Sequence, residues 1–214
     1  MSKLLHFLIT AGPTREYLDS VRFLTNASSG KMGYACAAAT VRRGHKVTLI
    51  SGPVHLTRPK GAKLVSVVSA ADMAEAVARH FPACDCVIMT AAVCDYRPKN
   101  PLRRKLRKDA SNMLLELERT DDILAGLGKA KGDKILIGFA VQDHAARRNA
   151  RRKLREKNLD AIVLNRPAAF MADKADVEIL PRHGLWINLP GISKTSLATK
   201  LVKLAEELSA KKQQ

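Results

Sequence analysis

This chain of 214 residues alternates short apolar runs with segments of helical periodicity, and no other feature of its sequence constrains the fold as strongly. The apolar runs that we interpret as strands cover residues 4–10, 47–51, 63–68, 86–92, 135–141 and 160–165. The helical patterns cover residues 31–43, 70–80, 121–130, 143–158 and 193–208. Strands that alternate with helices form right-handed crossovers, which build a mostly parallel sheet with helices on both faces. We therefore expect an α/β fold with a doubly wound, Rossmann-like sheet, in one domain that covers residues 1–214.

Two segments depart from this alternation. Residues 177–180 and 185–189 are short strand patterns joined by a four-residue turn, which predicts a hairpin. A basic, proline-containing stretch at about residues 96–119 includes the apolar run 113–117, which we interpret as a strand outside the main sheet. We expect this stretch to form an arm.

The charge balance is strongly basic. Lysine and arginine number 37 against 20 aspartate and glutamate, so the formal net charge is +17. A field of this sign attracts phosphates, nucleic acid or an anionic surface, and it does not choose among them. Twelve of the cations form two runs: Arg103, Arg104, Lys105, Arg107 and Lys108 in the arm, and Arg147, Arg148, Arg151, Arg152, Lys153, Arg155 and Lys157 on a later helix. We expect about two or three of them to touch a ligand, because most charges in such runs are solvated.

The cysteines favour a reducing compartment. Three of the four, Cys84, Cys86 and Cys94, fall in or beside one apolar strand, which suits buried thiols better than a disulfide framework. Cys84 and Cys86 are too close in sequence for a zinc clip. The N-terminus lacks a signal-peptide pattern, and no apolar stretch approaches the length of a membrane span. We expect a soluble, cytoplasmic protein that does not contact membranes.

Residues that directly follow the apolar runs are the candidates for ligand binding, because ligands of doubly wound sheets lie beyond the carboxyl ends of the strands. Gly30 and Gly33 flank the start of the first helix, where backbone amides and the positive helix end favour a phosphate. Their spacing is equally compatible with tight packing. Asp95 follows the run 86–92. Its carboxylate could orient an amide or hydroxyl group of a ligand, or it could simply cap a turn. A Walker pattern and a full dinucleotide fingerprint are both absent.

Several of these segments together resemble the phosphopantothenoylcysteine synthetase family. The matching segments are residues 10–16 (Thr-Ala-Gly-Pro-Thr-Arg-Glu), 18–19, 21–23, 26, 28–33, 91–93 with 95–97, 105 with 108, 122–124, 138–140 and 157–160. They cover nearly the whole chain in the family's order. The resemblance implies a two-step ligation: CTP activates the carboxylate of 4'-phosphopantothenate as an acyl-cytidylate with loss of pyrophosphate, and the amine of L-cysteine then displaces CMP. It also implies Mg²⁺ with the triphosphate, through ligands that the sequence leaves unidentified, and a homodimer whose arm closes over the partner's site.

The resemblance assigns three residues to the chemistry. Asn26 matches the asparagine that acts in turnover of the acyl intermediate, where an amide can donate a hydrogen bond to the developing oxyanion. Arg22 matches an arginine required nearby. Lys105 matches the arm lysine that acts in acyl-nucleotide formation.

The remaining matches are binding residues. Those expected at the nucleotide are Ala91, Asp95, Asp122, Ile123, Leu124, Phe139, Lys153 and Lys157. Those expected near the phosphates are Gly12, Ser28, Gly30, Gly33 and Asn165. The chain departs from the family at Asp121, where proline is usual, and at residues 141–143, so ATP stays open as a less favoured alternative to CTP. Arg166 stands where an acidic residue is usual.

Two alternatives come from other classes of protein. A basic α/β nucleic-acid-binding protein would account for the net charge, but the sequence offers no aromatic platform for bases. A dehydrogenase-like protein would have a similar sheet, but the glycine fingerprint is missing. The nucleic-acid-binding alternative also leaves the segments 26–33 and 91–95 unexplained.

Overall fold

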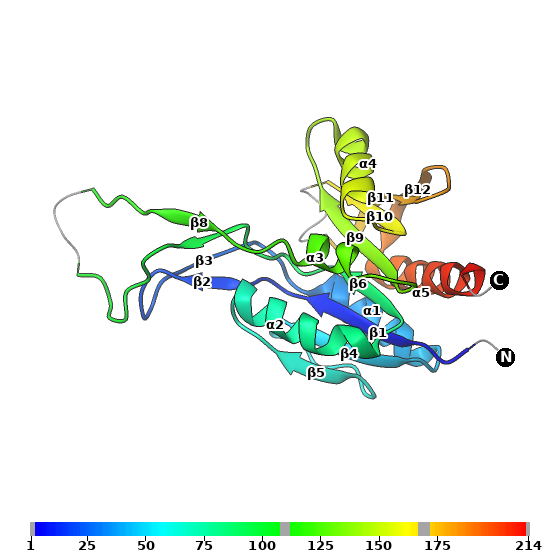
Figure 1. The fold of residues 1–214 in the computed structure, drawn as a ribbon, viewed down its shortest axis with the longest axis horizontal. Coiled ribbons are helices and arrows are strands. Elements are labelled where there is room, and N and C mark those ends of the chain that lie inside the picture. The colour runs from blue at the N-terminus through cyan, green and yellow to red at the C-terminus, as the bar shows by residue number, and fades with distance from the viewer. Residues whose placement is uncertain (1–2, 108–111, 167–171, 213–214) are drawn as a thin grey trace.

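The computed structural model describes residues 3–107, 112–166 and 172–212, and its centre is an eight-stranded mixed sheet (Figure 1). The order across the sheet is β12-β11-β10-β9-β6-β1-β4-β5. These strands are β1 (His6–Ala11), β4 (Lys46–Ser51), β5 (Lys63–Ser66), β6 (Cys86–Met89), β9 (Ile135–Val141), β10 (Ala161–Asn165), β11 (Lys174–Pro181) and β12 (Ile187–Ser193). Six of them, from β10 to β5, pair in parallel. The expected α/β fold with a mostly parallel sheet is confirmed.

The predicted C-terminal hairpin is confirmed and is part of the main sheet. β11 pairs antiparallel with β10, and β12 pairs antiparallel with β11. Because the direction reverses twice, β12 runs parallel to β10 and ends at the same edge of the sheet. That edge holds the carboxyl ends of all six parallel strands.

Five α-helices of the described residues cover the two faces of the sheet (Figure 1). They are α1 (Lys31–Arg42), α2 (Ala70–His80), α3 (Ile123–Lys129), α4 (Ala146–Glu156) and α5 (Lys194–Lys211). α1 and α5 pack on one face in the same core as Phe7 and Ile9, whereas α2, α3 and α4 pack on the other face with Leu8. Strands covered on both sides need apolar side chains at every position, which explains their unbroken apolar sequence. None of the described helices is long and apolar enough to cross a membrane.

The arm is built from two hairpins, whereas the sequence indicated one segment. β2 (Arg15–Tyr17) pairs with β3 (Phe23–Thr25), and β7 (Tyr96–Pro98) pairs with β8 (Leu117–Arg119). They project together from the body of the molecule (Figure 1). The first hairpin follows β1 and the second follows β6, which are neighbouring strands at the centre of the sheet.

The predicted strand at residues 113–117 is wrong except at its last residue. The strand begins at Leu117 and is set by cross-strand pairs of opposite charge. Arg97 pairs with Glu118 at 2.7 Å, and Lys99 pairs with Glu116 at 2.5 Å. The apolar residues before this segment are exposed, and Leu114 is 98% exposed. The start of this strand therefore depends on its cross-strand partners and not on apolar character.

All four cysteines are buried and free, as expected from their positions in apolar segments. Burial raises the pKa of the Cys36 thiol to about 12. Burial also raises the pKa of Cys84 to about 11. These thiols are protonated at neutral pH, which makes them inert core residues.

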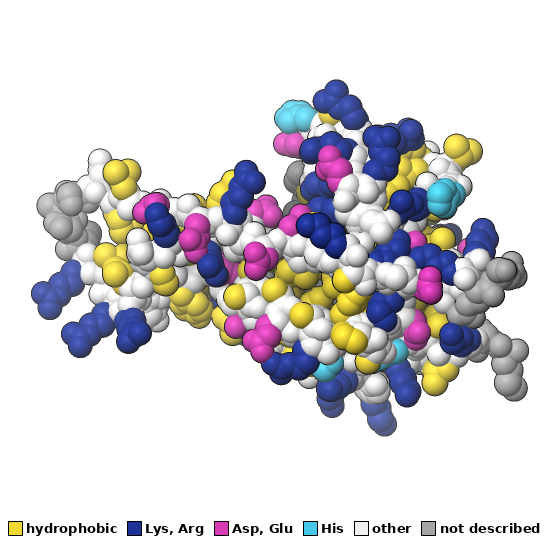
Figure 2. All heavy atoms as spheres, viewed as in Figure 1, with side chains coloured by type: hydrophobic (Ala, Val, Ile, Leu, Met, Phe, Trp, Pro, Cys, Tyr) yellow, Lys and Arg dark blue, Asp and Glu magenta, His cyan; other side chains and the backbone are white. Residues whose placement is uncertain are grey.

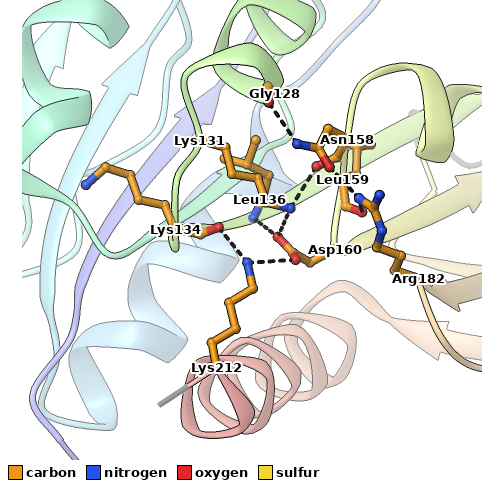
Figure 3. A network of polar contacts seen from close by, with 9 residues as sticks. All are labelled: Gly128, Lys131, Lys134, Leu136, Asn158, Leu159, Asp160, Arg182 and Lys212. Carbon is orange, nitrogen blue, oxygen red and sulfur yellow. Dashed lines mark hydrogen bonds and ion pairs between the residues drawn. The ribbon is translucent and has the colours of Figure 1, made fainter. Parts of the chain in front are cut away.

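A polar network ties the ends of three elements together at the edge of the sheet opposite the strand carboxyl ends (Figure 3). Asp160, just before β10, accepts a hydrogen bond from the backbone N–H of Leu136 at 2.8 Å. Its carboxylate also pairs with Lys131 at 2.9 Å and with Lys212, beyond α5, at 3.0 Å. Lys131 donates to the carbonyl of Asn158 as well. Asn158 and Asp160, part of a segment that matched the family, thus support the fold and line no part of the crevice described below.

A second polar contact joins α1 to α5. The carboxylate of Glu206 accepts two hydrogen bonds from Arg43, at 2.6 and 2.7 Å, and one from Nε2 of His45 at 2.7 Å. The backbone N–H of Leu5 donates to Nδ1 of the same imidazole. Because Nδ1 accepts from Leu5, the hydrogen bond between Nε2 and Glu206 is one that the ring donates.

We expect this contact to make stability depend on pH. Hydrogen bonds from Arg43 and His45 hold the pKa of Glu206 below its usual range, although burial opposes them. The unfolded state has the higher pKa, so the stabilisation is fully present above the unfolded value and is lost as pH falls through the folded value. Glu206→Gln should lower the free energy of unfolding by about 1 kcal/mol at pH 7 and by less at pH 4, measured by urea denaturation. The exposed neighbour Glu207 provides the control Glu207→Gln, and an equal loss at both pH values would contradict the assignment.

Candidate functional site

Two adjoining cavities lie at the carboxyl edge of the sheet, beside the point where the chain leaves the neighbouring strands β1 and β6 in opposite directions. The first is lined by Ser28, Ser29, Gly30, Lys31, Met32, Gly33, Thr90, Ala91, Ala92, Phe139, Val141, Asn165 and Lys194. The second is lined by Asn26, Met89, Ala91, Ala92, Val93, Asp95, Thr120, Asp121, Asp122, Ile123, Leu124, Phe139, Val141, Lys153 and Lys157. Because four residues line both, we treat the two as one crevice. A doubly wound sheet binds its ligands at such a place.

The first cavity is built around the start of α1. An α-helix leaves the N–H groups of its first turn without intrahelical partners, and here that turn, Lys31 to Gly33, lines the cavity. Gly30 precedes it with φ of 74°, a left-handed conformation that favours glycine. A side chain on Gly30 would also approach Val54 at 2.9 Å and the backbone of Gly12 at 3.4 Å. Gly12 therefore lies beneath the cavity and supports it without lining it.

Gly33 fixes the distance between α1 and the sheet. A Cβ atom at this position would lie 2.4 Å from the Cβ of Ala11 and 2.7 Å from the hydroxyl of Thr90. It would also lie 2.9 Å from the carbonyl of Thr10. The helix can pack this closely on the ends of β1 and β6 only with glycine there.

We expect Gly33→Ala to reverse the usual effect of this substitution. In an open helical position Gly→Ala stabilises a protein by up to about 1 kcal/mol. At Gly33 the clash should instead cost about 1–3 kcal/mol, measured as a lower urea midpoint. Gly126→Ala in α3 is the matched control, because a Cβ there meets no atom within 4 Å. Stabilisation by both substitutions would refute the packing argument.

Two lysines also line the first cavity: Lys31, which lies in the matching segment 28–33, and Lys194, which the sequence did not indicate. Lys31 pairs with Asp173 at 2.8 Å, and Lys194 donates to the carbonyl of Ala172. Burial lowers the pKa of Lys194, and the nearby charge of Lys31 lowers it further, while Asp173 opposes both. Lys194 begins α5 directly after β12, whose end lies at the carboxyl edge. The predicted hairpin could have indicated the position of Lys194. A chain that reverses direction twice after β10 ends its last strand at the carboxyl edge.

The second cavity has charges of both signs. Asp122 accepts a hydrogen bond from the N–H of Ala125 and so caps α3, and Lys157 lies 2.7 Å from its carboxylate. Burial raises the pKa of Asp122, but Lys157 and the capped N–H outweigh it, so the pKa is lowered overall. Burial and the charge of Lys157 lower the pKa of Lys153. The exposed Asp95 lines the same cavity.

Asn26 lies at the wall of the second cavity. Its Nδ2 donates to the carbonyl of Ala92 at 3.2 Å and to that of Val93 at 3.0 Å. Both acceptors belong to the segment that follows β6. These two hydrogen bonds orient the Asn26 amide and tie it to the segment after β6.

The structure places thirteen of the sixteen predicted site residues in the crevice. They are Asn26, Ser28, Gly30, Gly33, Ala91, Asp95, Asp122, Ile123, Leu124, Phe139, Lys153, Lys157 and Asn165. Gly12 lies beneath it, and Arg22 and Lys105 lie on the arm, outside the crevice of their own chain. Of the twelve cations in the two basic runs, Lys153 and Lys157 line the crevice, and Lys108 lies outside the described residues. Many of the other cations gather on the outside of α4 (Figure 2).

The family model described as the DNA/pantothenate metabolism flavoprotein C-terminal domain matches residues 3–208. The chain belongs to this family. A curated relative, the Coenzyme A biosynthesis bifunctional protein CoaBC of Bacillus subtilis (strain 168), is 48% identical over 209 residues, which are 95% of this chain and 52% of the relative. The chain spans about half the length of the curated relatives it matches.

Solved structures agree with membership of the DNA/pantothenate metabolism flavoprotein C-terminal domain family. The crystal structure of the C-terminal domain of the Coenzyme A biosynthesis bifunctional protein CoaBC has a TM-score of 0.86 at 43% identity, covering 99% of this chain and 100% of that chain. A Cab2 mutant in complex with phosphopantothenate-cysteine has a TM-score of 0.81 at 15% identity, covering 97% of this chain and 88% of that chain. Likeness at the lower identity supports the fold alone.

Proposed function

We propose that this chain joins 4'-phosphopantothenate to L-cysteine, with CTP as the activating nucleotide. In the first step a carboxylate oxygen of 4'-phosphopantothenate attacks the α-phosphorus of CTP, and pyrophosphate leaves. In the second step the amine of cysteine attacks the acyl carbon of the acyl-cytidylate, and CMP leaves. The product is 4'-phosphopantothenoylcysteine. ATP is the less favoured nucleotide.

The observation that supports this function best is the division of the crevice into two unlike ends. The first end combines helix-start amides, two serines and two lysines, which is the chemistry that holds phosphates. The second end has carboxylates, lysines and small apolar residues, which suit a nucleoside with amide and hydroxyl groups. Membership of a family with relatives in coenzyme A biosynthesis supports a reaction of phosphopantothenate.

Mg²⁺ would accompany the triphosphate and offset its charge. The described residues contain no group of three or more His, Cys, Asp or Glu side chains that could hold a metal by themselves. A magnesium ion held mainly by phosphate oxygens and water still fits the first cavity. Asn165 Oδ1 is buried there and is the one buried side-chain oxygen or nitrogen of the described residues without a hydrogen-bond partner. It can accept a hydrogen bond from magnesium-bound water or from the ligand.

We propose that a second copy of the chain covers the arm. Eight of the large apolar side chains exposed in the described residues lie on it: Tyr17, Val21, Tyr96, Leu102, Met113, Leu114, Leu115 and Leu117. Apolar side chains gathered in this way mark an interaction surface. Lys105 lies on the same arm and does not line the crevice of its own chain, so we place it in the partner's crevice.

Subunit mixing tests this exchange of arms. Lys105→Gln and Asn26→Asp chains should each form inactive homodimers. If Lys105 acts in the partner's crevice, each mixed dimer contains one site with both native residues, and mixing should restore about a quarter of the wild-type rate. If Lys105 acts in its own chain, every site stays defective and no activity returns.

The reaction itself is tested by pyrophosphate release from the purified protein with 4'-phosphopantothenate and Mg²⁺. CTP and ATP are compared, each with and without cysteine. Release with CTP, and ligated product only after cysteine is added, would support both the reaction and the nucleotide. Preference for ATP would overturn the nucleotide assignment. Folded protein that releases no pyrophosphate with either nucleotide would refute the proposed function.

A further inference from the structure

Asp19 is a buried carboxylate at the turn between β2 and β3, and its side chain is 0% exposed. Its Oδ1 accepts hydrogen bonds from the backbone N–H groups of Val21 and Arg22, both at 2.7 Å. Its Oδ2 accepts from the guanidinium of Arg22 at 2.6 Å and from the backbone N–H of Leu106 at 3.1 Å. One carboxylate thus holds two segments that are 87 residues apart in the sequence.

The two segments touch at further points. The backbone N–H of Leu102 donates to the carbonyl of Leu18 at 2.8 Å. The Arg22 guanidinium also donates to the carbonyl of Leu106 at 3.4 Å. These contacts enclose the basic loop of residues 103–105, so the backbone on either side of Lys105 is tied to the first hairpin.

We infer that Asp19 is a positioning residue, which locks Arg22 and the backbone beside Lys105 into one unit and so presents both cations to the reacting nucleotide. This inference rests on the proposed function. Acyl-nucleotide formation depends on a cation held where charge develops, and a loosely held cation loses much of that effect. Arg22 has 48% of its side chain exposed while Asp19 has none, so the guanidinium keeps an open side for a ligand or a partner chain.

An ionised carboxylate is the group that fits this place. Four donors converge on it, and a carboxylate only accepts hydrogen bonds. An asparagine would turn an NH₂ group toward other N–H donors and would leave Arg22 without its counter-charge. The N–H groups of Arg22, Val21 and Leu106, with the Arg22 guanidinium, hold the pKa of Asp19 well below its usual range, although burial opposes them. The carboxylate therefore stays ionised throughout the pH range of an activity assay.

The test compares Asp19→Asn with the control Glu118→Gln, which removes an arm ion pair with Arg97 but leaves the loop untouched. For Asp19→Asn we expect the rate of the pyrophosphate burst to fall about 10- to 100-fold at every pH between 6 and 9, with the KM for CTP within about twofold of wild type. Trypsin should also cut at residues 103–107 faster than in the control. An unchanged burst rate, or a loss that appears only in KM, would overturn the inference.

A second variant covers a failure of Asp19→Asn to fold. Leu106→Pro removes the N–H that reaches Asp19 and leaves the ion pair with Arg22 in place. It should give the same fall in burst rate and the same tryptic cleavage, and a normal burst would count against the positioning role. If wild-type protein releases no pyrophosphate, the proposed function fails. The tryptic comparison still tests in that case whether Asp19 holds the backbone beside Lys105. Cleavage of Asp19→Asn no faster than that of the control would overturn this positioning role.

Discussion

Replacing Asn26 with aspartate is expected to lower the rate of ligated product by about 10²–10³-fold, which is the usual cost of losing one oxyanion donor. Asn26 donates both of its amide N–H groups to the carbonyls of Ala92 and Val93 at the wall of the crevice. During the attack by cysteine, one N–H would turn from its carbonyl to the developing oxyanion. A carboxylate at this point offers no donor and repels both the oxyanion and the two carbonyls.

The measurement separates the two chemical steps. Rapid quenching with CTP and 4'-phosphopantothenate should still show a pyrophosphate burst from Asn26→Asp, and the acyl-cytidylate should accumulate after cysteine is added. Asn26→Ala separates charge from donor loss, because it removes the donor without adding a negative charge, and its defect should be smaller. Product formation at the wild-type rate by Asn26→Asp, in protein with a native circular dichroism spectrum, would refute the role of Asn26.

Asp160→Asn is expected to lower the free energy of unfolding by about 3–5 kcal/mol, because it leaves the buried ammonium group of Lys131 without its counter-charge. Asp160 and Lys131 are each 7% exposed, and Lys212 shares the same carboxylate. Burial already lowers the pKa of Lys131 in spite of the attraction of Asp160. Without the carboxylate, Lys131 must either lose its proton or stay charged in a poorly solvated place.

Urea denaturation measures this loss against Asp173→Asn. Asp173 pairs with Lys31 at 2.8 Å, but its side chain is 82% exposed. Exposed pairs contribute about 0–1 kcal/mol, so the control should change stability little. If the two variants lost similar amounts of unfolding free energy, burial would not explain how strongly an ion pair stabilises this fold.

Much of the fold was predictable because helices on both sides of a parallel sheet impose one pattern on the whole chain. The apolar runs at β1, β6 and β9 are continuous since each strand is covered on both faces. The hairpin of β2 and β3 was missed for an equally physical reason. Its strands are three residues long, and the buried Glu16 accepts a hydrogen bond from Ala70 where an apolar side chain would have signalled a strand.

The site was predictable where it follows the parallel strands. Asp95 was found by its place after such a strand, Gly30 and Gly33 by their place at the start of the first helix, and the family resemblance supplied the other predicted residues of the crevice. Lys194 was missed because its place at the carboxyl edge depends on how the predicted hairpin joins the main sheet, which the local pattern does not indicate. The places of Arg22 and Lys105 depend on contacts between the two hairpins of the arm, which no local pattern indicates.

The position of α5 has a consequence for folding during synthesis. It is made after every strand of the sheet, yet it packs on α1 and contributes Lys194 to the crevice. The ion pair between Asp160 and Lys212 also forms only after this helix is made, because Lys212 lies beyond its end. A ribosome that has released only the chain up to β12 therefore presents a sheet with one apolar face covered by α1 alone and an unfinished crevice. The crevice is complete only when the closing helix has emerged, so nascent chains should depend on shielding of the uncovered part of that face until then.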